Sequence, residues 1–340
     1  MPNHSQHLIT VTSYADQVCT IAERLGFWPA ESVVAVWRKS QRELLVQRVD
    51  IPDPGWSVLI SDSAWWTEFA RPGNLHDATS VGLLLVDPPL YSDSSDLREM
   101  WLTTLSDQLL KKACESLNQF GITVDEVLLV HKSTVTSEDC TSSCDMHRVS
   151  AQLIPSASEL SRADAAATLA FAPERGLSLQ IQQWAESRLQ ADSSTWCIDE
   201  LNFLENVFVQ PPPLSDSLIA RCAQALAVVS VRDTLLWDIA AGDIASVASA
   251  HFLSSMLPSL HGPVGAPVAT VAGICWWMSG NGAKANLCLH RAHECQPDYP
   301  LALLVAAAVG VGLPPSIWVE SVLELHRDEC LRRGELAESH

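Results

Sequence analysis

The sequence predicts an α/β domain with a mixed sheet, followed by an all-α domain of helical hairpins. Short apolar runs of strand length alternate with amphipathic helical segments through about the first 150 residues. After residue 177 no segment has a convincing strand pattern, and Gly or Pro residues separate successive helical segments. The length of 340 residues suits two domains, which we place at 1–160 and 161–340.

Local patterns predict each element of the first domain in turn. Residues 14–25 carry apolar side chains on one helical face and stop before Gly26, a typical helix-ending residue. The apolar run 32–37 and the alternating run 43–49 flank a polar turn and predict a hairpin. The next expected elements are a helix in 56–69, a strand at 81–86, an amphipathic helix at 93–120, a strand at 124–131, and a polar loop or irregular hairpin at 132–150 with 151–153 returning to the sheet.

Helices alone are predicted for the second domain. They lie at 180–189, 199–207, 216–229, 232–241, 244–256, 267–279, 283–295, 301–309 and 315–333. One pair matches the tetratricopeptide pattern, with Gly273 and Ala285 where two helices cross and Trp276 at the aromatic position. The upstream pair is a weaker copy, because Pro258 and Pro297 are 39 residues apart rather than ~34. We therefore expect a tetratricopeptide-like array of hairpins, with a non-repeating helical domain as the alternative.

Composition excludes several classes of protein. Hydrophobic residues make up 47% and charged residues 18%, which excludes a disordered chain. The net charge of −19 disfavours nucleic acid and anionic membranes as partners and favours a basic protein. The N-terminus lacks a secretory pattern, so we expect a cytoplasmic location. The stretch 300–319 has no charged residue but contains Gly and Pro, which predicts a buried helix with a proline stop rather than a membrane span.

Four residues of metal-binding type follow the last strand of the apolar series. His131 ends that strand, and Cys140, Cys144 and His147 lie in the polar segment after it. Two thiolates and two imidazoles are the donors of a tetrahedral zinc site. The segment lacks the Cys-x-x-Cys pair of the common zinc motifs. A disulfide or redox pair and an ordinary polar loop therefore stay open as alternatives.

Five other residues are candidates for contact with a ligand or partner. Arg48 and Asp50 lie two apart on a predicted strand and so share one face of the sheet. Arg232 begins a predicted helix beside Asp233. Each set has an ordinary ion pair as its alternative interpretation. Trp276 and Trp277 are adjacent, as are Trp65 and Trp66, so we expect one ring of each pair to face outward or into an interface; packing at a domain junction is the alternative.

Several sequence strings together identify a family resemblance. They are LGFWPAESVVAV at 25–36, RVDIPDP at 48–54, VSVRDTLLW at 229–237, WWMSGNGAKANLCLHRAHECQPDYPLALL at 276–304 and GLPPSIW at 312–318. The combination resembles the actinobacterial family called domain of unknown function 4192, over nearly the whole chain. The resemblance implies an actinobacterial, cytoplasmic protein whose two halves belong together, and it implies no activity.

These observations favour a non-enzymatic interaction or scaffold protein that binds through its helical domain. The partner is expected to be a protein, with a basic partner favoured by charge, and a homo-oligomer is equally compatible. The second hypothesis is an enzyme or small-ligand sensor that uses Arg48, Asp50 and Arg232 in a cleft of the first domain or at the domain junction. The third is a zinc or redox module at 131–147. The sequence contains no P-loop, G-x-G-x-x-G or G-x-S-x-G motif, so we expect no other cofactor and no catalytic residue.

Overall fold

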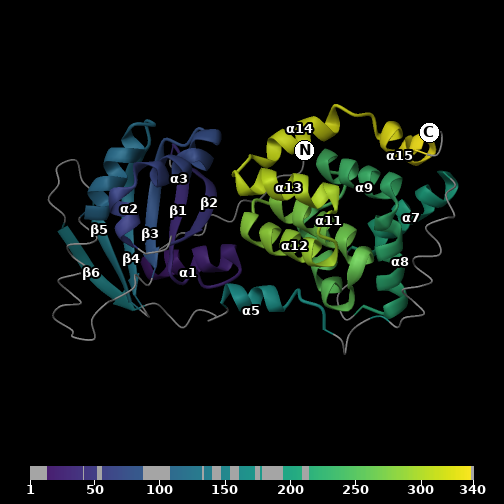
Figure 1. Cartoon of the computed structure of the whole chain (residues 1–340), viewed down its shortest axis with the longest axis horizontal. Coiled ribbons are helices and arrows are strands. Elements are labelled where there is room, and N and C mark those ends of the chain that lie inside the picture. Colours follow the sequence, from purple (N-terminus) through teal and green to yellow (C-terminus); the bar gives the residue numbers. More distant parts are fainter. Residues whose placement is uncertain are drawn as a thin grey trace. The chain divides into compact units, whose positions relative to one another are not determined.

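The computed structural model divides the chain into two compact units (Figure 1). These units are Met1–Arg162 and Ala163–His340. The structure describes residues 14–40, 42–51, 56–86, 108–131, 134–139, 147–153, 161–172, 177, 194–208 and 214–337. The first unit contains a mixed sheet with helices, and the described part of the second is helical, so the predicted fold class is confirmed.

A six-stranded sheet forms the centre of the first unit. Its spatial order is β2-β1-β3-β4-β5-β6. Only β3 and β4 run parallel, and every other neighbouring pair is antiparallel. The bounds are β1 Ser32–Lys39, β2 Arg42–Asp50, β3 Ser80–Val86, β4 Thr123–His131, β5 Thr134–Asp139 and β6 His147–Leu153. The segment 132–150 thus contains most of a hairpin that extends the sheet. Of the two predicted alternatives, a polar loop and an irregular hairpin, the hairpin is the one observed.

Helices cover both faces of this sheet. One face packs its alternate residues, such as Val33, Leu83 and Val127, against α2 (Trp56–Ser61), α3 (Ser63–Leu75) and the helical stretch 108–118. The other face meets α1 (Tyr14–Leu25), whose Gln17 Nε2 donates to Glu126 Oε2 at 2.7 Å. The bounds predicted for this first helix are confirmed. Both faces are buried, which explains why β3 reads as a continuous apolar run rather than an alternating one.

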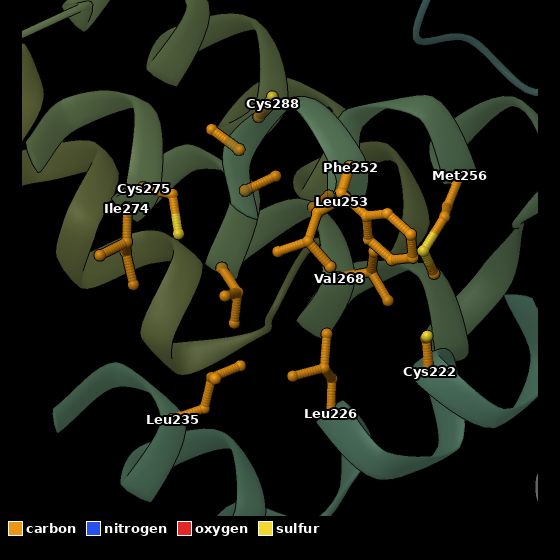
Figure 2. Close-up of a cluster of buried hydrophobic side chains, with 14 of the residues drawn as sticks. Cys222, Leu226, Leu235, Phe252, Leu253, Met256, Val268, Ile274, Cys275 and Cys288 are labelled. Carbon is orange, nitrogen blue, oxygen red and sulfur yellow. The ribbon is translucent and has the colours of Figure 1, made fainter. Parts of the chain in front are cut away.

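The second unit is organised around one almost entirely buried helix. α11 (Gly265–Met278) buries 13 residues and lies among helices α8, α9, α10 and α12. Figure 2 shows this core, with Leu226, Leu235, Leu253 and Val268 converging from four helices. The helical bounds are α5 Arg162–Ala167, α7 Ser194–Val207, α8 Asp216–Ala227, α9 Val229–Ala241, α10 Ser246–Met256, α12 Gly282–Cys295, α13 Pro300–Gly310, α14 Pro315–Leu323 and α15 Arg327–Ala337.

Helices α11 and α12 form the hairpin that the sequence predicts around Gly273. A β-carbon at Gly273 would lie 3.0 Å from Leu289 Cγ and 3.3 Å from the carbonyl oxygen of Ala285. Glycine therefore allows the two helices to approach closely at this point. Gly280 has a φ of 82° in the turn between them, and the Asn281 side chain caps α12 by accepting from Lys284 N.

Two expectations for the C-terminal helices are wrong, and one lies outside the described residues. The segment 315–333 is not a single helix, because α14 ends at Leu323 and α15 begins at Arg327. In the stretch 300–319 a helix does stop before the prolines, as predicted, but it is not buried: α13 buries only Ala302, Val305 and Val309, and α14 buries no residue. The helix predicted at 180–189 is outside the described part of the chain. Within the described part, every helix is too short or too polar to cross a membrane.

Candidate functional site

A pocket opens among helices α9, α13, α14 and α15 of the helical unit. Its volume is about 610 Å³, within the usual range for ligand-binding pockets. Most of its lining is apolar. The lining residues are Val229, Arg232, Asp233, Leu236, Tyr299, Pro300, Leu301, Leu304, Trp318, Ser321, Val322, Leu325 and Cys330.

Indole hydrogen bonds hold the two turns that shape this pocket. Trp277 Nε1 donates to the carbonyl oxygen of Leu313 at 3.1 Å, which fixes the turn between α13 and α14. Trp237 Nε1 donates to the carbonyl oxygen of Leu325 at 2.9 Å, which fixes the turn between α14 and α15. Each bond satisfies a carbonyl group at or just beyond a helix end. The turn after α14, which the sequence analysis did not predict, is thus held against α9 by the bond from Trp237.

An ion pair reinforces the second turn. Arg327 donates to both carboxylate oxygens of Asp238, with Nε–Oδ1 and Nη2–Oδ2 distances of 2.5 and 2.9 Å. The side chain of Asp238 is 2% exposed, so this carboxylate depends on Arg327 for its compensation. The pair joins α9 to the start of α15 and thereby positions Leu325 and Cys330 on the pocket wall.

Three polar residues form one side of the pocket. Arg232 Nη2 donates to Asp233 Oδ1 at 2.7 Å, and Arg232 Nη1 donates to the Tyr299 hydroxyl oxygen. Burial opposes the charge of Arg232, but Asp233 and Tyr299 together raise the pKa of its guanidinium. Burial also raises the pKa of Tyr299, although Arg232 acts in the opposite direction. The phenol therefore stays protonated near neutral pH, and the cluster carries no net charge.

The mouth of the pocket exposes apolar side chains. Leu304 is 63% exposed and Val229 is 44% exposed, and both belong to the lining. Large apolar side chains of this exposure near one opening are typical of a surface that is covered when a partner binds.

Comparison with protein-family models assigns the chain to a family. The model described as "Domain of unknown function (DUF4192)" matches residues 21–316, which is most of the sequence. The chain belongs to this family. The match includes the α9 and α13 walls of the pocket, whereas Trp318, Leu325 and Cys330 lie beyond it. Searches of curated proteins and of solved structures gave no significant match.

In this DUF4192 chain the predicted polar contacts fall in different units. Arg48 and Asp50 form an ion pair in the first unit, with Arg48 Nη2 to Asp50 Oδ1 at 2.6 Å. The same nitrogen donates to the carbonyl oxygen of Ala30 at 3.1 Å, and the guanidinium lies 5.7 Å from the Phe27 ring centroid. Arg232 lines a pocket formed within the helical unit alone. The shared face predicted for Arg48 and Asp50 is thus confirmed, and the ion-pair alternative describes their contact.

The tryptophan pair of this DUF4192 chain is buried. Trp276 is 6% exposed and Trp277 is 4% exposed, so the expectation of an outward ring at this pair is wrong. The reason is that α11 is surrounded by other helices. Trp276 Nε1 donates to Ser254 Oγ at 3.0 Å, and Lys284 Nζ lies 4.5 Å from the indole centroid. Trp277 supports the pocket indirectly through Leu313.

The sheet register places the backbone of the two histidines of the predicted zinc site. His131 pairs with Thr134 at one end of β5, and His147 pairs with Asp139 at the other end. These ends are five residues apart, about 17 Å along a strand. A zinc site formed by His131, Cys140, Cys144 and His147 stays a prediction. Cys140 and Cys144 lie outside the described residues.

Two buried thiols of the helical unit are unsuited to redox chemistry. Cys222 and Cys288 are fully buried, and burial raises the pKa of each thiol to about 12. At pH 8 only about one in 10⁴ is then a thiolate, the reactive form. We expect iodoacetamide to leave both residues unmodified in the native protein at pH 8 and to modify both in urea, as peptide mass spectrometry measures. Rapid native modification would contradict this burial.

Several pocket residues escaped the sequence analysis, although one signal pointed to them. Tyr299, Leu304 and Trp318 belong to or adjoin the charge-free stretch 300–319. That stretch has apolar residues all around α13, more than one buried face requires. Apolar residues beyond those needed for one buried face indicate a second apolar contact of the helix. In α13 this second apolar face lines the pocket.

Proposed function

We propose that this chain is a non-enzymatic, cytoplasmic interaction protein whose helical unit binds an apolar group of a protein partner in the pocket. The observation that carries the proposal is the pocket of about 610 Å³ with exposed Leu304 and Val229 at its mouth. Burial of exposed apolar surface is the main favourable term in most protein associations. The cluster of Arg232, Asp233 and Tyr299 gives the otherwise apolar wall a polar edge that orients what binds.

A tetratricopeptide-like arrangement of the helical unit is part of this proposal. The close crossing at Gly273 and the tight turn at Gly280 support it for α11 and α12. Helical-hairpin arrays present partner-binding surfaces built from several helices. The pocket, with walls from four helices, supports a role of this kind.

A neutral apolar dye tests the pocket independently of partner identity. N-phenyl-1-naphthylamine fluoresces more strongly in an apolar site, and we expect the protein to bind it. The substitution Leu304→Ser should weaken dye binding about fivefold to tenfold, because it removes apolar contact area worth about 1 kcal/mol. The measurement is a fluorescence titration that gives Kd for each variant.

The chain offers a matched control for this test. Leu303 is 50% exposed on the same helix but does not line the pocket. Leu303→Ser should leave the Kd for the dye within a factor of two, and both variants should keep the native melting temperature within a few degrees. Equal losses for the two variants, or no loss for Leu304→Ser, would show that the dye binds elsewhere and would remove support for the proposed function.

A further inference from the structure

We propose that the partner group is an amphipathic helix with a basic polar face, docked with its apolar face over this pocket. The inference rests on the proposed function, because it names the partner of the same site. It follows from the size of the pocket, the exposed apolar residues around its mouth and the charges beside its lining.

The size of the pocket favours a helix over a single anchoring side chain. Replacing one buried leucine with alanine opens a cavity of about 150 Å³, so a volume of about 610 Å³ accepts roughly four leucine-sized groups. A helix presents such a set at positions i, i+3 or i+4, and i+7 on one face. Exposed Leu304 and Val229 at the mouth provide further apolar contact for the flanks of that face.

Acidic residues stand next to the lining on three elements. Asp298 is exposed beside Tyr299, and Glu329 is exposed beside Cys330. Glu320 and Glu324 are exposed beside Ser321 and Leu325 on and just after α14. Each of these carboxylates is one residue along the sequence from a lining residue, so the elements that build the pocket carry exposed negative charge.

Two arginines of the same region, unlike the exposed Arg332, are already paired with carboxylates. Arg232 is paired with Asp233, and Arg327 is paired with the buried Asp238. The apolar mouth is thus accompanied by exposed carboxylates, and the whole chain carries a net charge of −19. Lysines or arginines along the polar face of a docked helix complement this arrangement, whereas an acidic helix or an anionic small molecule is repelled.

Three synthetic peptides of 18 residues test the inference. The first has leucines on one helical face and lysines elsewhere, the second has glutamate in place of every lysine, and the third has the composition of the first with leucines spread around the helix. Fluorescence anisotropy of labelled peptide gives each Kd. We expect the first peptide to bind at least tenfold more tightly than the others and to displace the dye. Raising the salt concentration should weaken its binding.

Protein variants separate the apolar and the charged contributions. Leu304→Ser should weaken binding of the first peptide about tenfold, and Leu303→Ser should change it less than twofold.

The double variant Glu320→Gln/Glu324→Gln should weaken binding of the first peptide about threefold at low salt. The pair Asp216→Asn/Asp243→Asn is the control, because it changes the net charge equally and neither residue adjoins the lining.

Each contrary result identifies which claim fails. Equal affinity for the acidic and basic peptides would overturn the basic partner while the pocket remained a binding site. Dye binding that depends on Leu304, but no displacement by any peptide, would overturn the helical partner and leave the proposed function standing. Tight binding of the scrambled basic peptide, unaffected by Leu304→Ser, would show charge attraction alone and overturn the inference.

Discussion

Replacement of Gly73 by alanine is expected to destabilise the α/β unit by about 3 kcal/mol. A β-carbon at this position would lie 2.4, 2.6 and 2.9 Å from atoms Cε3, Cζ3 and Cδ2 of Trp37. The indole has little room to move, since Trp37 is fully buried and packs 5.6 Å from the Phe69 ring centroid. Trp37 Nε1 also donates to Gln47 Oε1 at 2.8 Å. The added methyl group therefore forces a shift in the helix, the strand or both.

The urea midpoint of the unfolding transition measures this loss. Gly310→Ala is the matched control, because a β-carbon there would have no atom within 4 Å. This control lies at the end of a helix and should stabilise its unit by up to about 1 kcal/mol. In a Trp37→Leu background the additional cost of Gly73→Ala should fall, because the atoms that meet the new methyl group are removed. An unchanged cost in that background would contradict the contact with Trp37.

Local periodicity was sufficient to predict most of the elements. The helix at 14–25 has the predicted bounds because its apolar face and the following Gly26 are encoded within a few residues. The strand β3 was equally clear, since both of its faces are buried. The hairpin of β5 and β6 was harder to predict from the sequence. Its segment is polar and lies at the edge of the sheet, where apolar alternation is weaker.

The candidate site could be predicted only in part, because it depends on contacts between distant residues. Arg232 was singled out, but Tyr299, which accepts its hydrogen bond, is 67 positions away. The bond from Trp237 to Leu325, which shapes the α14–α15 turn, spans 88 positions. The periodicity of apolar residues along one helix does not reveal such contacts between distant residues. The excess of apolar residues in 300–319 indicated a second contact, but not which helices supply it.

The substitution Arg327→Leu should destabilise the helical unit by about 3 kcal/mol and weaken dye binding in the pocket. It leaves the carboxylate of Asp238, which is 2% exposed, without its two charge-assisted hydrogen bonds. A buried carboxylate that loses its partner costs more than the pair contributed, because the desolvation of the charge is no longer compensated. The turn that carries Leu325 and Cys330 then loses its ionic tie to α9, which explains the expected effect on the pocket.

Two further variants separate the ion pair from general effects of the substitution. Arg332→Leu removes an exposed arginine of the same helix and should cost less than about 0.5 kcal/mol, with dye binding unchanged. Asp238→Asn combined with Arg327→Leu should recover part of the lost stability, because no charge remains buried without a partner. Chemical denaturation and the dye titration measure both effects. If Arg327→Leu and Arg332→Leu proved equally mild, Asp238 would have another source of compensation, and the ionic tie between α9 and α15 would not shape the pocket.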